Sequence, residues 1–293
     1  MFSIEGLIIN TGEPKLGRVE IDLTTGLIVK VGEPTGEADV ILQDQLIFPG
    51  FVDLHVHARE DVSHSQDYKE DFVSAGQAAI NGGVVAFAEM PNNPVPPIDD
   101  ISYQNKSDLT KKSEVTVVLY AGIGPNTKPL AKLVPYKVFM GPSVGELFFT
   151  SKNDLENVIA KYSGQNVSFH CEDPEILEKN KNESTHILRR PKEAETQAID
   201  FALMLIKKYN LIGKICHCST LSGIEKIISA KKEGLAVTVE VTPTHLFFDS
   251  SMLEGEKIKF LQMNPPVRQD KENRLGLIEH LRLGNIDYLA TDR

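Results

Sequence analysis

The sequence has no tryptophan, only three cysteines among its 293 residues, and no apolar run long enough to span a bilayer. Cysteines that are sparse and odd in number do not build a disulfide framework, so they indicate a reducing compartment, which we take to be the cytoplasm. The first residues show neither the basic start nor the long apolar stretch of a signal peptide. These absences argue against a secreted or membrane-spanning protein.

The sequence also lacks any block of like charge. The formal net charge is −10, from 31 basic and 41 acidic residues. Nucleic acid and anionic membrane surfaces recruit clustered Lys and Arg, so neither is expected as a main partner.

What the chain does contain is two successive patterns of apolar residues. Residues 1–46 are short β-like runs separated by Gly and Pro, which predicts a small antiparallel sheet that is not stable alone. From residue 47 to residue 293, apolar strands alternate with helix-like stretches, which is typical of a parallel (β/α)8 barrel of the α/β class. The expected strands are Ile47–His55, Val84–Met90, Val115–Ala121, Lys137–Met140, Val167–His170, Lys214–Cys218, Ala236–Val241 and Ile286–Thr291.

Helices are expected between these strands, several of them ended by glycine. They are Asp67–Ile80, Ile101–Lys112, a short one at Leu130–Pro135, Lys152–Tyr162, Pro191–Tyr209, Leu221–Lys232 and Lys271–Arg282. An open doubly wound sheet is the alternative fold. No Gly-x-Gly-x-x-Gly follows the first strand, and this favours the barrel.

The first barrel strand carries two histidines, His55 and His57, in an apolar run. Side chains in a strand alternate with a period of two, so both imidazoles point to one side. Two neutral imidazoles on a rigid strand suit a divalent metal such as zinc. Arg59 continues the same parity, and its planar guanidinium suits a carboxylate. Taken alone, such a pair is more often two ordinary polar side chains at a strand end.

Further polar residues fall at the ends of other expected strands, where barrels place their chemistry. His170, His217 and Asp292 end the fifth, sixth and eighth strands, and Lys137 begins the fourth. Each residue alone is ordinary, but four histidines and an aspartate at one barrel face indicate a metal site. Cys216 and Cys218 flank His217 with opposite parity, so we expect both to face the helix layer as small core residues.

Several motifs together resemble the amidohydrolase superfamily and, within it, the dihydroorotase family. The resemblance runs from about Ile47 to the last residue. Its motifs are Asp53-Leu-His-Val-His-Ala-Arg-Glu60, Met90-Pro-Asn-Asn-Pro94, Lys137-Val-Phe-Met-Gly-Pro-Ser143, His170-Cys-Glu-Asp173, Arg190-Pro-x-x-Ala-Glu195, His217-Cys-Ser-Thr220, Met263-Asn-Pro-Pro-Val-Arg268 and Ala290-Thr-Asp292. The N-terminal segment is similar to half of the small β-sandwich of these enzymes.

The resemblance implies a site with two zinc ions. His55, His57 and Asp292 would hold one ion, and His170 and His217 the other. Lys137, carboxylated by carbon dioxide, would bridge them. A free lysine has a pKa near 10.4 and is a poor zinc ligand, whereas a carbamate offers two anionic oxygens.

The implied reaction is the reversible hydrolysis of L-dihydroorotate to N-carbamoyl-L-aspartate in pyrimidine biosynthesis. A hydroxide that bridges the metals would attack the ring amide, and Asp292 would act as general base and then general acid. Arg59 and Asn92 would grip the substrate carboxylate, and Asn264 would contact the substrate. Two alternatives stay open: a hydantoinase- or allantoinase-like amidase for rings without that carboxylate, and an inactive scaffold that supports a partner.

The sequence departs from the family pattern in three places. Asp61-Val62 stands where Pro-Gly is usual, and Thr244 replaces the first of two adjacent histidines, so His245 is a weaker candidate for the site. Family members continue beyond Asp292 with Ala-Pro-His, whereas this sequence ends at Arg293. We therefore expect a fragment of a longer chain, with an exposed apolar face on the N-terminal sheet. The expected macromolecular partners are a second copy of the chain and aspartate transcarbamoylase.

Overall fold

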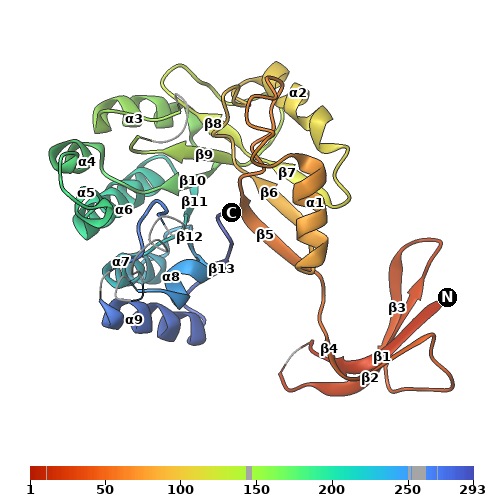
Figure 1. The fold of residues 1–293 in the computed structure, drawn as a ribbon. Helices are drawn as coiled ribbons and strands as arrows, with labels where there is room; N and C mark the ends of the chain where they lie inside the picture. The colour runs from red at the N-terminus through yellow and green to blue at the C-terminus, as the bar shows by residue number, and fades with distance from the viewer. Residues whose placement is uncertain (11, 143–146, 250–251, 253–261, 269) are drawn as a thin grey trace. The chain divides into compact units, whose positions relative to one another are not determined.

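The computed structural model describes residues 1–293 except 11, 143–146, 250–251, 253–261 and 269 (Figure 1). The chain divides into two compact units, Met1–Phe51 and Val52–Arg293. Among the described residues, no helix is long and apolar enough to cross a membrane.

The first unit is a four-stranded sheet of β1 (Phe2–Ile8), β2 (Lys15–Asp22), β3 (Leu27–Gly32) and β4 (Val40–Ile47). The strand order is β3-β2-β1-β4. The expectation of a purely antiparallel sheet is wrong, because β4 pairs with β1 in parallel. The segment after β3 has to cross to the far edge of the sheet, and it returns the chain in the direction of β1 rather than against it.

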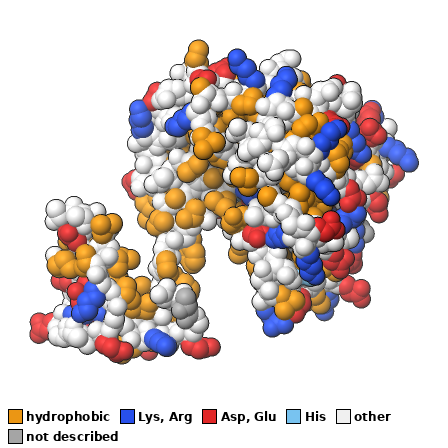
Figure 2. All heavy atoms as spheres, turned by 180° about the vertical axis from the view of Figure 1, so that it is seen from behind, with side chains coloured by type: hydrophobic (Ala, Val, Ile, Leu, Met, Phe, Trp, Pro, Cys, Tyr) orange, Lys and Arg blue, Asp and Glu red, His pale blue; other side chains and the backbone are white. Residues whose placement is uncertain are grey.

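Apolar side chains of this sheet are exposed, and orange atoms mark them on the smaller part in Figure 2. Leu27 and Ile28 of β3 are 63% and 62% exposed, and Ile41 of β4 is 63% exposed. This many exposed apolar side chains on one small sheet agree with the apolar surface expected from the sequence.

The second unit is a closed barrel of parallel strands with helices outside (Figure 1). Hydrogen bonds continue from the last strand to the first, because Asp292 N–H donates to His55 O at 3.0 Å and His57 N–H donates to Arg293 O at 2.7 Å. The expected α/β barrel is therefore confirmed. Its strands are β5 (Phe51–Val56), β6 (Val84–Glu89), β7 (Thr116–Leu119), β8 (Ala121–Ile123), β9 (Tyr136–Phe139), β10 (Asn166–His170), β11 (Ile212–Ile215), β12 (Val237–Val241) and β13 (Tyr288–Leu289).

Two expected strands have different limits for local reasons. The run expected at Ile47–His55 is divided, because Pro49 and Gly50 separate β4 from β5. The third barrel strand is interrupted at Tyr120, whose N–H donates to Glu89 O on one side. Ala121 N–H then donates to Pro135 O on the other side, so β7 and β8 each bond one neighbour.

The barrel unit contains α1 (Phe72–Asn81), α2 (Asp100–Thr110), α3 (Lys152–Ile159), α4 (Pro174–Asn180), α5 (His186–Arg189), α6 (Lys192–Lys208), α7 (Leu221–Lys232), α8 (Pro243–Phe247) and α9 (Lys271–Arg282), with a 3₁₀ turn at Ala160–Tyr162. Two expectations about helices are wrong. Residues 130–135 are not helical, since Pro135 disfavours a helical conformation before it. The first helix begins at Phe72 rather than Asp67, because Asp71 caps it by accepting from Ser74 N–H.

Candidate metal centre at the barrel mouth

The residues predicted for the site gather around one cavity of about 550 Å³ at the carboxyl ends of the barrel strands. Its lining includes His55, His57, Arg59, Asn92, His170, His217, Asn264 and Asp292. Lys137, on β9, is fully buried. The barrel therefore brings together side chains that the sequence scatters over more than 200 positions.

Unusual backbone conformations direct several of these side chains into the cavity. Arg59, His217 and Asp292 have φ values of 62°, 35° and 54°, in the left-handed region that side chains other than glycine rarely adopt. Such conformations cost free energy and are retained where the surrounding structure imposes them, often at functional sites. Each of the three residues lies just beyond the end of its strand.

Asp292 lies between the two histidines of the first strand. Its Oδ1 is 3.2 Å from Nε2 of His55 and 3.2 Å from Nε2 of His57. Burial alone would raise the pKa of this carboxyl, but the imidazoles of His55 and His57 outweigh burial and lower the pKa to about 2. Asp292 is therefore an anionic acceptor at neutral pH, facing two ring nitrogens.

His170 and His217 form a second convergent pair. Nδ1 of His170 lies 3.0 Å from Nε2 of His217. Burial, reinforced by His170 and Lys137, lowers the pKa of His217 well below its usual range, so its ring is neutral. The other nitrogen of His170, Nε2, donates to Oε2 of Glu172 at 2.9 Å, so Nδ1 is the ring nitrogen that faces His217.

Lys137 is the feature that tests whether this donor set fits a metal. Its Nζ is buried and has no hydrogen-bond partner among the residues that the structure describes. Burying an amine without a hydrogen-bond acceptor costs free energy, so a bound group other than a protein side chain is expected beside Nζ. Carbamate formation together with a divalent metal satisfies that requirement, and neutral imidazoles with a carboxylate are typical ligands of zinc.

The side of the cavity that Arg59 and Asn92 line is supported by buried charged residues. Ala58 N–H, next to Arg59, donates to Oε2 of Glu89 at 2.6 Å, and Lys106 pairs with the other oxygen of Glu89 at 2.9 Å. Oδ1 of Asn92 is buried and unpaired within the described part of the chain. Arg59 and Asn92 therefore both offer polar groups to the cavity. At Oδ1 of Asn92, no described protein group would compete with a ligand.

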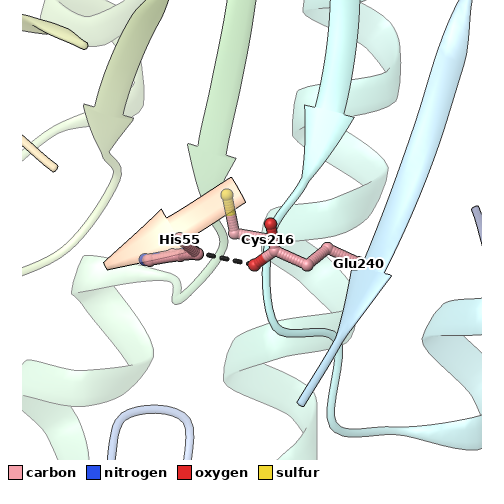
Figure 3. Close-up of side chains that lie close together, drawn as sticks. All are labelled: His55, Cys216 and Glu240. Carbon is pink, nitrogen blue, oxygen red and sulfur yellow. Dashed lines mark hydrogen bonds and ion pairs between the residues drawn. The ribbon is translucent and has the colours of Figure 1, made fainter. Parts of the chain in front are cut away.

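The structure also corrects one expectation near the site. Cys216 does not face the helix layer, because its sulfur lies within 4.8 Å of ligand atoms of His55 and Glu240 (Figure 3). The parity argument fails because β11 ends at Ile215 and the left-handed His217 breaks the alternation. Cys218 does lie in the core cluster with α6 and α7, as expected.

His245, the weaker candidate, has a structural role in this arrangement. Its Nδ1 lies 2.9 Å from Oγ1 of Thr242, and its Nε2 donates to Pro265 O at 3.0 Å. Both ring nitrogens are thus occupied within the protein. His245 holds the segment that carries Asn264, and it does not line the cavity.

The sequence analysis missed four charged residues around the site. Arg190 lines the cavity and pairs with Glu172. Glu240 and Lys214 pair with each other beneath His55, at 2.7 Å. One signal was available, since Glu240 interrupts the otherwise apolar strand run Val-Thr-Val-Glu-Val.

Comparison with known proteins agrees with this geometry. Residues 46–113 match the model of the Amidohydrolase family. The dihydroorotase of Thermococcus kodakarensis is 33% identical over 99% of this chain and 66% of its own length. That of Pyrococcus furiosus is 32% identical over 85% of this chain and 55% of its own length. The chain thus spans about half to two thirds of the length of these curated relatives.

Solved structures agree on the fold. An L-hydantoinase from Arthrobacter aurescens superposes with a TM-score of 0.85 at 23% identity, over 100% of this chain and 69% of the other. At that identity the likeness concerns the fold alone. Together with the family match, the dihydroorotase relatives place this chain in the amidohydrolase family, and the barrel fold agrees with this.

Proposed function

We propose that this chain carries the catalytic barrel of a zinc-dependent dihydroorotase, which interconverts L-dihydroorotate and N-carbamoyl-L-aspartate. The observation that carries the proposal is the convergence of His55, His57, His170, His217 and Asp292 near an unpaired, buried Lys137. This donor set fits two divalent ions bridged by a carboxylated Lys137. His55, His57 and Asp292 would hold one ion, and His170 and His217 the other.

The bound metal would supply an activated water at neutral pH and would polarise the amide carbonyl. The protein supplies the proton transfers. Asp292 is ionised at neutral pH, so it can accept the proton of the attacking water and return it to the leaving ring nitrogen. Its position between two imidazoles keeps the carboxylate oriented toward the cavity.

Substrate selection is assigned to three other residues that line the same cavity. Arg59 and Asn92 would bind the substrate carboxylate, and Asn264 would contact the ring. A hydantoinase-like activity on neutral rings is the second candidate, because the similar solved structures include an L-hydantoinase. The two candidates differ in whether Arg59 binds a charged group of the substrate.

An inactive scaffold would be expected to have lost ligands, whereas all six positions carry suitable residues here. Residues 1–46 are proposed to be a partial β-sandwich subdomain. A cytoplasmic location, a homodimer and association with aspartate transcarbamoylase complete the proposal.

The test is to assay Arg59→Met with dihydroorotate and with hydantoin. Loss of a charge-assisted pair costs about 1.5–3 kcal/mol, so KM for dihydroorotate should rise about 10- to 100-fold while zinc content is unchanged. An unchanged KM for dihydroorotate, or better turnover of hydantoin by the unaltered protein, contradicts the dihydroorotase assignment and favours the neutral-ring candidate.

A further inference from the structure

Glu240 of β12 is a completely buried carboxylate directly below the site. Its Oε1 accepts from Nδ1 of His55 at 2.7 Å and from the N–H of His217 at 3.1 Å. Its Oε2 accepts from Nζ of Lys214 at 2.7 Å. Both oxygens therefore have donors, and two of these donors belong to residues proposed as metal ligands.

Lys214 is held in place from several sides. It lies on β11, is 5% exposed, and its Nζ approaches Leu54 O at 3.4 Å as well as Glu240. The same Nζ lies 5.3 Å from the centre of the Tyr120 ring. The ammonium is thus directed at Glu240 from inside the barrel, and not at solvent.

These contacts determine which ring nitrogen of His55 carries the proton. Both oxygens of Glu240 already face the donors Lys214 and His217 N–H, so Oε1 is an acceptor, Nδ1 of His55 carries the proton, and Nε2 keeps its lone pair. That Nε2 faces Oδ1 of Asp292 at 3.2 Å. Through the N–H of His217, the same carboxylate oxygen also supports the left-handed turn that directs the second histidine pair.

His55, Cys216 and Glu240 lie close enough together to suggest a metal cluster of their own (Figure 3). Glu240 does not fit the role of a ligand there, because its two oxygens already accept three hydrogen bonds. Burial raises the pKa of the Cys216 thiol, which disfavours the thiolate that a metal would need. The group supports the site above it.

We propose that Glu240, held by Lys214, is a positioning residue that fixes the ring tautomer of His55 and the backbone of His217, and thereby strengthens zinc binding in the barrel. The proposal rests on the proposed function, since it concerns the same metal site. Carboxylates behind metal-bound histidines typically contribute a factor of about 10 to 100 to metal affinity.

The competing account is that Glu240 and Lys214 are only a buried ion pair that stabilises the fold. Breaking such a pair is strongly destabilising, whereas replacing both partners with neutral groups is often tolerated. The two accounts therefore differ in what the double replacement does. A structural pair predicts that zinc affinity recovers together with stability, and a positioning pair predicts that it does not.

The experiment compares Glu240→Gln, Lys214→Met and the double variant with the unaltered chain. Zinc affinity is measured by competition with a chromophoric chelator, and Tm is measured on the metal-free proteins. We expect each single variant to melt at lower temperature, and the double variant to melt near the unaltered chain. Zinc affinity should stay about 10- to 100-fold lower in both Glu240→Gln and the double variant.

Asp287→Asn is the matched control, because Asp287 precedes β13 and bonds the same strand β12 from its neighbour. Oδ2 of Asp287 accepts from Val239 N–H of β12 at 2.7 Å and pairs with Lys231 at the outside of the barrel. This variant should lower Tm and leave zinc affinity unchanged. A fall in zinc affinity as large as that of Glu240→Gln would show that any damage to β12 has this effect, and would overturn the proposal.

Two results separate this proposal from the proposed function. If the double variant binds zinc as tightly as the unaltered chain, the positioning role is wrong while the metal site stands. If the unaltered chain binds no zinc, the proposed function is wrong, and the positioning role that rests on it is wrong as well. Nitrogen-15 spectra of His55 in the metal-free chain should also show a proton on Nδ1, and a proton on Nε2 would overturn the proposal directly.

Discussion

Nε2 of His57 lies 3.2 Å from Oδ1 of Asp292, although 235 positions separate the two residues in the chain. The contact exists because the end of β13 bonds the end of β5 and closes the barrel. The first and last strands of the barrel thus build one half of the proposed metal site together, and this half depends on ring closure.

Replacing Asp292 with Asn should separate its two assigned roles. The amide keeps the size of the side chain but cannot take up a proton, so we expect kcat for dihydroorotate to fall about 10²- to 10⁴-fold. Zinc content should fall less than activity, because four histidines remain. Full activity with an unchanged pH profile would remove Asp292 from the reaction.

Lys137 and Lys106 are both buried lysines, and they should respond to Met in opposite ways. Lys106 is paired with Glu89 at 2.9 Å, so Lys106→Met leaves a buried carboxylate unpaired and should destabilise the fold by about 3–5 kcal/mol. Lys137 forms no ion pair with a carboxylate among the described residues, and its Nζ faces only the Phe139 ring and the Cys216 thiol, so Lys137→Met should not lower the Tm of the metal-free protein. It should abolish the binding of at least one zinc ion.

Thermal melts in chelator, together with metal analysis, check this pair of predictions. A large loss of metal-free stability in Lys137→Met would mean that its ammonium has a protein partner. Normal zinc content in that variant would remove Lys137 from the metal site.

Much of this arrangement could be predicted from the sequence, and the failures have identifiable causes. Strand-end histidines were recognisable because barrel chemistry sits at one face and the spacing of His55 and His57 matches the strand period. The position of Cys216 was not predictable, since no local pattern announces the left-handed conformation of His217. Glu240 was missed because its three donors come from two other strands, His55 from β5 and Lys214 and His217 from β11 and its end.

The residues 130–135 show the opposite kind of failure. The stretch contains residues that favour helices, but Leu130 N–H donates to the hydroxyl of Tyr136 at 2.8 Å in place of a helical bond. This tertiary contact replaces a helical hydrogen bond, and Pro135 disfavours a helical conformation of the residue before it.

Arg268 should be important for stability although it does not line the cavity itself. It is 3% exposed, and it donates to Oγ of Ser219 at 2.8 Å, to Arg190 O at 2.7 Å and to Glu195 at 2.7 Å. Arg268→Met leaves Glu195 buried without its cation and should cost about 3–5 kcal/mol of unfolding free energy. Denaturant melts measure this cost.

The matched control is Arg282→Met, which removes an arginine from an exposed pair with Glu279 on α9. Solvent screens that pair, so its removal should leave the denaturation midpoint nearly unchanged. Equal effects of the two replacements would contradict the role given to Arg268.

The three cysteines should be unreactive in the folded protein. Cys171, Cys216 and Cys218 are free and buried, and burial raises the pKa of each thiol, so the thiolate is scarcer at neutral pH than for an exposed cysteine. Iodoacetamide should label none of them at pH 7.5 in native protein and all of them in denaturant. Rapid native labelling of Cys216 would contradict its position beneath His55.

The central claim is most directly tested by counting zinc per chain in protein purified without added metal, with dihydroorotate hydrolysis assayed on the same sample. The account predicts about two zinc ions per chain together with turnover that a chelator removes. Folded protein that holds no zinc, even after incubation with zinc and bicarbonate, and that does not hydrolyse dihydroorotate would contradict it.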